Sequence, residues 1–104
     1  MGIKLNSVYV PSEKVVARKI EDELIIIPIQ EGFADLNDAM FSLNETGQAV
    51  WEKLVSSNTV LSIIRMLTEE FDASFEQIEK DVLILLEQLY QKQLIIDAAA
   101  GTSD

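Results

Sequence analysis

The sequence has no cysteine and no histidine among its 104 residues. Without cysteine there is no disulfide, no thiolate nucleophile and no sulfur ligand for a metal or an iron–sulfur cluster. Without histidine the chain lacks the commonest general base and the best zinc ligand. Catalysis would have to rest on carboxylates, lysine or tyrosine, and no carboxylate pair stands out. We therefore expect a protein that is not an enzyme, with no catalytic residue, no metal and no cofactor.

Basic residues are scarce. The chain has 8 Lys and Arg against 18 Asp and Glu, which gives a net charge of −10, and the basic residues are scattered. Nucleic-acid binders neutralise phosphates with clustered Lys and Arg, so we expect this surface to repel DNA and acidic lipid headgroups. The acids Glu31, Asp35 and Asp38 lack the spacing of a calcium-binding EF-hand, and we interpret them as part of a solvated loop.

Long apolar runs are also missing. The longest are Leu24–Ile27 and Val82–Leu86, far below the ~20 residues that span a bilayer. No apolar segment of a signal peptide follows Lys4. We expect a soluble, cytoplasmic protein with no membrane partner.

The first half of the chain predicts three strands. Val15–Ile20 and Leu24–Ile29 are rich in β-branched residues and are separated by three acids, a pattern that favours a hairpin. Pro28 cannot donate to a ladder, so the second strand should end there or leave an edge open. A short third strand is expected over Ala39–Leu43, with Phe41 and Leu43 pointing inward.

The second half predicts three helices, which begin after the N-cap residues Asn44, Thr59 and Ser74. Ser74 and Gln77 have the spacing of a capping box, and the third helix should reach about Gln91. Helical spacing predicts buried faces that include Val50, Trp51, Leu54 and Val55 in the first helix, Val60, Ile63, Ile64, Leu67 and Phe71 in the second, and Phe75, Ile78, Val82, Leu85, Leu86 and Leu89 in the third.

A chain of this length forms one domain. We expect an extended N-terminal lead-in over residues 1–14, a folded domain over residues 15–96 that closes with Leu94-Ile95-Ile96, and a flexible C-terminal tail over residues 97–104. The order of elements predicts an α+β fold like a winged helix-turn-helix, in which a three-stranded antiparallel sheet is followed by a three-helix bundle.

Short motifs carry a resemblance to a known family. Leu43-Asn44-Glu45-Thr46-Gly47 is followed by Val50-Trp51, then by Thr59-Val60 with Ile63, by Asp81-Val82 and by a closing Leu94-Ile95. In this order the motifs resemble the PqqD family, also called RiPP recognition elements, from about Val16 to Ile96. One departure is Ser56-Ser57-Asn58, which replaces the Asp-Gly often seen before the second helix.

The resemblance implies a peptide chaperone. Domains of this family add the leader of a ribosomally made precursor peptide as an extra strand to their third strand, against the third helix, and present it to a modifying enzyme, often a radical SAM protein. This is β-augmentation, in which main-chain hydrogen bonds give affinity and side-chain pockets give selectivity.

Seven residues are candidates for contact with the peptide: Met40, Phe41 and Ser42 in the third strand, and Asp81, Ile84, Leu85 and Gln88 in the third helix. Ile84 lies nearly opposite the core stripe of that helix. It forms either one wall of a shallow groove or an isolated apolar residue of the kind that ordinary surfaces carry. Asp81 would pair with a basic side chain or an amide of the peptide.

Two further possibilities stay open at this stage. The chain is either a peptide-binding chaperone or, as the alternative, a winged-helix DNA-binding regulator, although its third helix offers Lys80 and Lys92 against four acids and no Arg. An exposed edge strand would also allow a homodimer.

Overall fold

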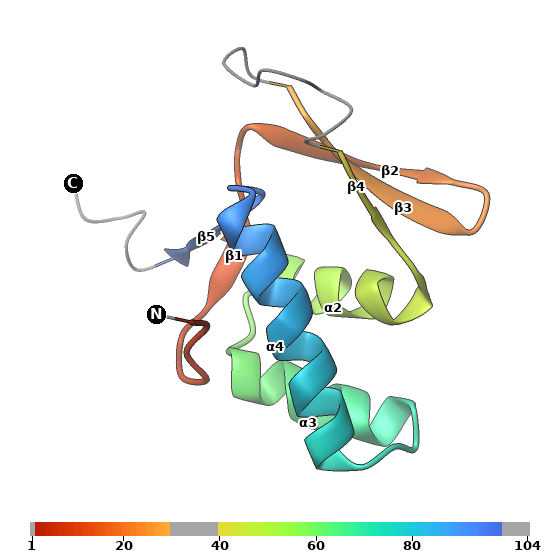
Figure 1. Ribbon diagram of the computed structural model, residues 1–104, viewed down its shortest axis with the longest axis vertical. Helices are drawn as coiled ribbons and strands as arrows, with labels where there is room; N and C mark the ends of the chain where they lie inside the picture. Colours follow the sequence, from red (N-terminus) through yellow and green to blue (C-terminus); the bar gives the residue numbers. More distant parts are fainter. Residues whose placement is uncertain (1, 30–39, 99–104) are drawn as a thin grey trace.

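A three-stranded sheet lies across one end of three packed helices, and a second, two-stranded sheet joins the ends of the chain (Figure 1). This computed structural model describes residues 2–29 and 40–98. The acids Glu31, Asp35 and Asp38 of the expected loop, as well as Ala39 and the tail from residue 99, lie outside the described residues. The elements are, in chain order, β1 (Tyr9–Pro11), β2 (Val15–Ile20), β3 (Glu23–Pro28), β4 (Phe41–Leu43), α2 (Glu45–Val55), α3 (Val60–Glu70), α4 (Phe75–Gln91) and β5 (Ile95–Asp97).

The larger sheet is antiparallel throughout, in the order β2-β3-β4. β2 has the predicted bounds. β3 begins one residue earlier than predicted, because Ile20 already pairs with Glu23, and it also ends one residue earlier. The turn therefore has only two residues, and its first, Glu21, has a φ of 57°. Pro28 ends β3, as expected of a residue that cannot donate to a ladder.

Each helix begins where its N-cap residue predicted. The side chains of Asn44, Thr59 and Ser74 each accept a hydrogen bond from the backbone N–H three residues later. Only one of the two hydrogen bonds of the capping box at Ser74 forms. The Gln77 side chain donates to Asp81 and not to the backbone of Ser74. The α+β fold, with a three-stranded antiparallel sheet followed by three helices, is confirmed.

The core lies between the helices and the inner face of the sheet. Trp51 is buried in α2, as expected of an anchor residue, and α4 contributes Ile78, Val82, Leu86 and Leu89. Phe75 and Val55, which helical spacing assigned to the core, are exposed because each lies at a helix end, where the buried stripe has already turned away. The core therefore includes fewer residues of each helix than the hydrophobic pattern of the sequence predicts.

The second sheet was not predicted. β1 pairs antiparallel with β5, with Tyr9 opposite Asp97 and Pro11 opposite Ile95. Tyr9 is buried, and its ring meets the edge of the Tyr90 ring at a centroid distance of 5.8 Å. Residues from the expected lead-in and Asp97 from the expected tail thus form regular structure.

Within residues 2–29 and 40–98, no helix is both long enough and apolar enough to cross a membrane.

Candidate functional site

β4 lies at the edge of the three-stranded sheet. It pairs with β3 on one side, and no other described strand pairs with it. The strand that sequence analysis nominated for peptide addition therefore has one open side in the part of the chain that the structure describes.

The ladder between β2 and β3 shows which backbone groups face that open side. Ile20 and Glu23 flank a two-residue turn, and the Ile29 N–H donates to the Lys14 C=O at 2.8 Å. In an antiparallel ladder the hydrogen-bonded pairs alternate. The odd-numbered residues of β3 therefore bond to β2, and the even-numbered ones face β4.

The same alternation continues into β4. Its register pairs Leu43 with Leu24, Ser42 with Ile25 and Phe41 with Ile26. Because Leu24 and Ile26 face β4, the backbone groups of Phe41 and Leu43 turn toward β3. The N–H and C=O of Ser42 then point to the open side, where an added strand would meet them.

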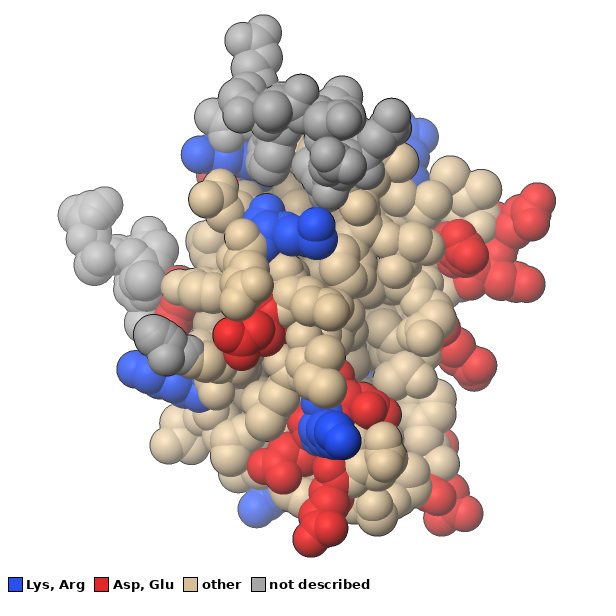
Figure 2. Space-filling view, viewed as in Figure 1, with Lys and Arg blue, Asp and Glu red and all other residues tan. Residues whose placement is uncertain are grey.

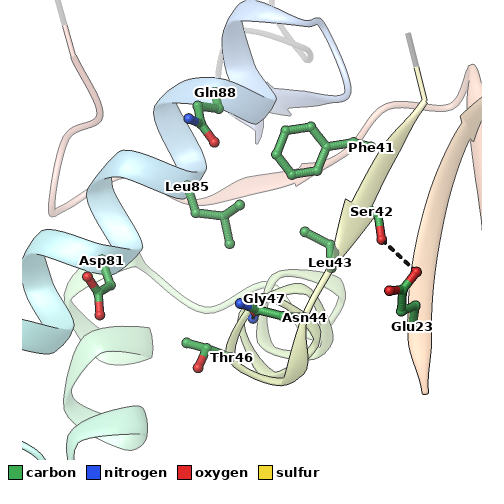
Figure 3. A pocket seen from close by; sticks show the side chains of 10 residues that line it. All are labelled: Glu23, Phe41, Ser42, Leu43, Asn44, Thr46, Gly47, Asp81, Leu85 and Gln88. Atoms are coloured by element: carbon green, nitrogen blue, oxygen red, sulfur yellow. Dashed lines mark hydrogen bonds between the residues drawn. The ribbon is translucent and has the colours of Figure 1, made fainter. Parts of the chain in front are cut away.

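A groove of about 500 Å³ separates β4 from α4. Figure 3 shows Phe41 and Leu43 pointing from β4 toward Leu85 on α4, with Gln88 near the Phe41 end and Asp81 near the first turn of α2. The lining residues are Glu23, Phe41, Ser42, Leu43, Asn44, Thr46, Gly47, Asp81, Leu85 and Gln88. The floor is apolar and both long sides carry polar groups, an arrangement suited to a peptide strand.

Five of the seven candidate residues line this groove: Phe41, Ser42, Asp81, Leu85 and Gln88. Met40 and Ile84 do not. Met40 immediately precedes β4 and is 38% exposed, and Ile84 is 50% exposed. Contact of any of the seven side chains with a peptide stays a prediction, and the Ile84→Ala variant described below tests whether Ile84 takes part.

The polar groups of the groove give it a negative charge. Asp81 accepts hydrogen bonds of 3.1 and 3.2 Å from Gln77, and the Ser42 hydroxyl donates to Glu23 at 3.1 Å. The lining contains these two acids and no Lys or Arg. In Figure 2, acidic side chains also predominate on the visible face over the end where α3 and α4 lie. A cationic guest is therefore favoured over an anionic one.

The first turn of α2 forms one end of the groove, with Asn44, Thr46 and Gly47, and sequence analysis did not nominate these residues. Asn44 accepts from the Gly47 N–H at 2.9 Å, which closes the turn. A Cβ added at Gly47 would lie 3.0 Å from Leu43 Cδ2, so glycine allows the helix to approach the strand. The Leu43–Gly47 motif was the available signal, because its cap places these residues beside β4.

The comparisons with known proteins agree with this geometry. A family model described as Coenzyme PQQ synthesis protein D (PqqD) matches residues 23–95, which include β3, β4 and the three helices. No curated protein sequence matches the chain at a significant level.

Two solved structures share the fold. One, titled "TbiB1 in Complex with the TbiA(beta) Leader Peptide", is 24% identical with a TM-score of 0.69, over 83% of this chain and 93% of the other. The second, titled "Lasso peptide synthetase B1 complexed with the leader peptide", is 13% identical with a TM-score of 0.72, over 86% of this chain and 99% of the other.

Proposed function

Since its residues 23–95 match the family model, the chain belongs to the PqqD family, and we propose that it captures the leader of a ribosomally made precursor peptide and presents it to a modifying enzyme. The observation that supports this most directly is the open side of β4 beside the groove between β4 and α4. Both solved structures with this fold contain a leader peptide.

The leader binds as a fourth strand of the sheet. Its backbone exchanges hydrogen bonds with the N–H and C=O of Ser42, and its side chains alternate between the two faces. The residue opposite Ser42 faces away from the helices. Its two neighbours, opposite Phe41 and Leu43, face inward and fill the groove over Leu85.

The lining indicates which leader side chains fit. Apolar residues suit the floor of Phe41, Leu43 and Leu85, because burying them removes their surface from water. A basic or amide side chain suits the end at Asp81, and Gln88 offers hydrogen bonds at the other end. The leader is therefore expected to contain two apolar residues two positions apart with a basic residue nearby.

The chain acts as a binding partner and performs no chemistry of its own. The enzyme it serves is a peptide-modifying protein, of which radical SAM enzymes are the type that the family resemblance implies. DNA binding has no support in this structure, because α4 presents Glu76, Glu79, Asp81 and Glu87 where a reading helix needs Arg and Lys.

An NMR titration tests the proposal. The ¹⁵N-labelled chain is titrated with a synthetic leader from the precursor encoded beside its gene. We expect the largest amide shifts at Phe41–Leu43 and Asp81–Gln88, with strand-like cross-peaks between the leader and Ser42. Shifts confined to other elements would contradict the groove. A doubled molecular mass with the same residues shifted would show instead that a second copy takes the open side of β4.

A further inference from the structure

The face of the three-stranded sheet that points away from the helices is apolar. Val15, Leu24 and Phe41 pack against the core, so the residues that alternate with them lie on the opposite face. In the register of β2 and β3, Val16 lies opposite Ile27 and Arg18 opposite Ile25, and Ile20 follows at the end of β2. We call the residues Val16, Arg18, Ile20, Ile25 and Ile27 the outer patch.

The outer patch is exposed and contiguous. Val16 is 37% and Ile20 53% exposed, and Ile25 and Ile27 are half-buried. Ile29, directly after β3, and Met40, directly before β4, are exposed beside it. A single exposed apolar side chain needs no explanation, whereas a group of neighbours on one sheet face marks an interaction surface.

Arg18 lies in the middle of this patch. Among the described residues it has no ion pair, and the carboxylate of Glu23 on the same face accepts from Ser42. Arginine is enriched among the residues that contribute most of the binding free energy at protein interfaces. The surface that covers the patch should therefore be apolar and should place a carboxylate opposite Arg18.

We propose that the outer patch is where the modifying enzyme docks, through an apolar surface that carries this carboxylate. The inference rests on the proposed function, because the patch continues into the peptide site. The Ser42 side chain lies on the outer face, and the leader residue opposite it would point the same way. An enzyme on this face therefore lies directly beside the bound leader.

Other occupants fit the patch less well. A second copy, stacked face to face about a two-fold axis, would bring two Arg18 guanidinium groups together. Acidic lipid and nucleic acid are disfavoured by the net charge of −10. Both remain outcomes that the experiment can detect.

The test uses the chain of 104 residues and purified candidate peptide-modifying enzymes encoded near its gene, with affinity measured by calorimetry. Arg18→Glu should weaken enzyme binding at least about tenfold. Lys19→Glu is the matched control, because it makes the same charge change at the next residue of β2, on the opposite face; it should weaken binding less than about twofold. Leader affinity should stay the same in both variants, since neither residue lines the groove.

Each result decides between distinct conclusions. The proposal that the enzyme docks on the outer patch would be overturned if both variants lost the same affinity for the enzyme, or if Arg18→Glu lost none. It would also be overturned if the wild-type chain bound the leader but not the enzyme. Enzyme binding that depends on Arg18, without leader binding, would support the patch and overturn the proposed function. Arg18-dependent binding to phosphatidylglycerol vesicles, or dimerisation that Arg18→Glu changes, would assign the patch to lipid or to a second copy instead.

Discussion

The sheet has two edge strands, and they differ in what lies beside them. β4 has three residues and faces α4 across a groove that contains Asp81 and Leu85. β2 has six residues, of which five are exposed, it carries Arg18 and Lys19, and no other described strand pairs with its open side. Both edges have backbone groups left over from the ladder, and among the described elements the groove bordered by α4 lies along β4.

The difference indicates what a sheet edge would need in order to serve as a peptide-binding site. An open edge is a template for any strand, including that of another copy, and charged residues such as Lys are a common protection against such pairing. The β2 edge has that protection. At β4 the wall of α4 adds side-chain selectivity to the main-chain bonds.

The largest expected effect comes from proline at each edge. Ser42→Pro removes the N–H that points to the open side of β4, so leader affinity should fall about 100-fold, or about 2.8 kcal/mol. Ala17→Pro is the control, because Ala17 lies opposite Ile26 in a pair of the β2–β3 ladder that exchanges no hydrogen bond, so its N–H points to the open side of β2. It should leave leader affinity unchanged, as calorimetry can measure.

Equal losses of affinity in the two proline variants would contradict the distinction between the edges. Folding is checked independently through the fluorescence of the buried Trp51.

The second prediction concerns the apolar floor of the groove. Leu85→Ala should lower leader affinity about tenfold, because it removes apolar contacts from this floor. Ile84→Ala deletes a similar side chain one residue away, outside the groove lining, and should change affinity less than about twofold. A larger loss at Ile84 would show that the leader reaches over the rim of α4.

Much of the fold followed from local signals in the sequence. The caps Asn44, Thr59 and Ser74 fixed the helix starts, because a side-chain acceptor at a helix end acts over only three residues. The pairing of β1 with β5 joins residues more than 80 positions apart, and nothing local in Tyr9–Pro11 announces it. Long-range pairing was therefore the part that sequence analysis missed.

The candidate site divides in the same way. The sequence could nominate Phe41, Ser42, Asp81, Leu85 and Gln88, which line the groove, because periodicity and the family resemblance pointed to one strand and one helix. The places of Glu23 and Thr46 depend on how β3 and α2 pack beside β4. That packing is a tertiary property, which periodicity within one element does not contain.

The third prediction tests the charge of the groove. Asp81→Asn keeps the shape of the side chain and removes its charge, so affinity for a leader with a basic residue should fall about fivefold at low salt. The effect should shrink as salt is added. Glu87→Gln is the control on the same helix, since Glu87 also accepts a hydrogen bond from a glutamine four residues away and does not line the groove. An equal loss at Glu87 would indicate attraction to the overall charge and not to the groove.

The smallest expected effect lies at the turn between β2 and β3. Glu21 adopts a φ of 57°, a conformation that costs a non-glycine residue about 1–2 kcal/mol. Glu21→Gly removes that cost but loses more chain entropy on folding, about 0.5–1 kcal/mol, so the net gain in unfolding free energy should be about 0.5 kcal/mol. Urea unfolding measures the gain, and leader affinity should not change because Glu21 does not line the groove. If the variant binds the leader more tightly, the hairpin of β2 and β3 influences the β4 edge, and the two edges are not independent.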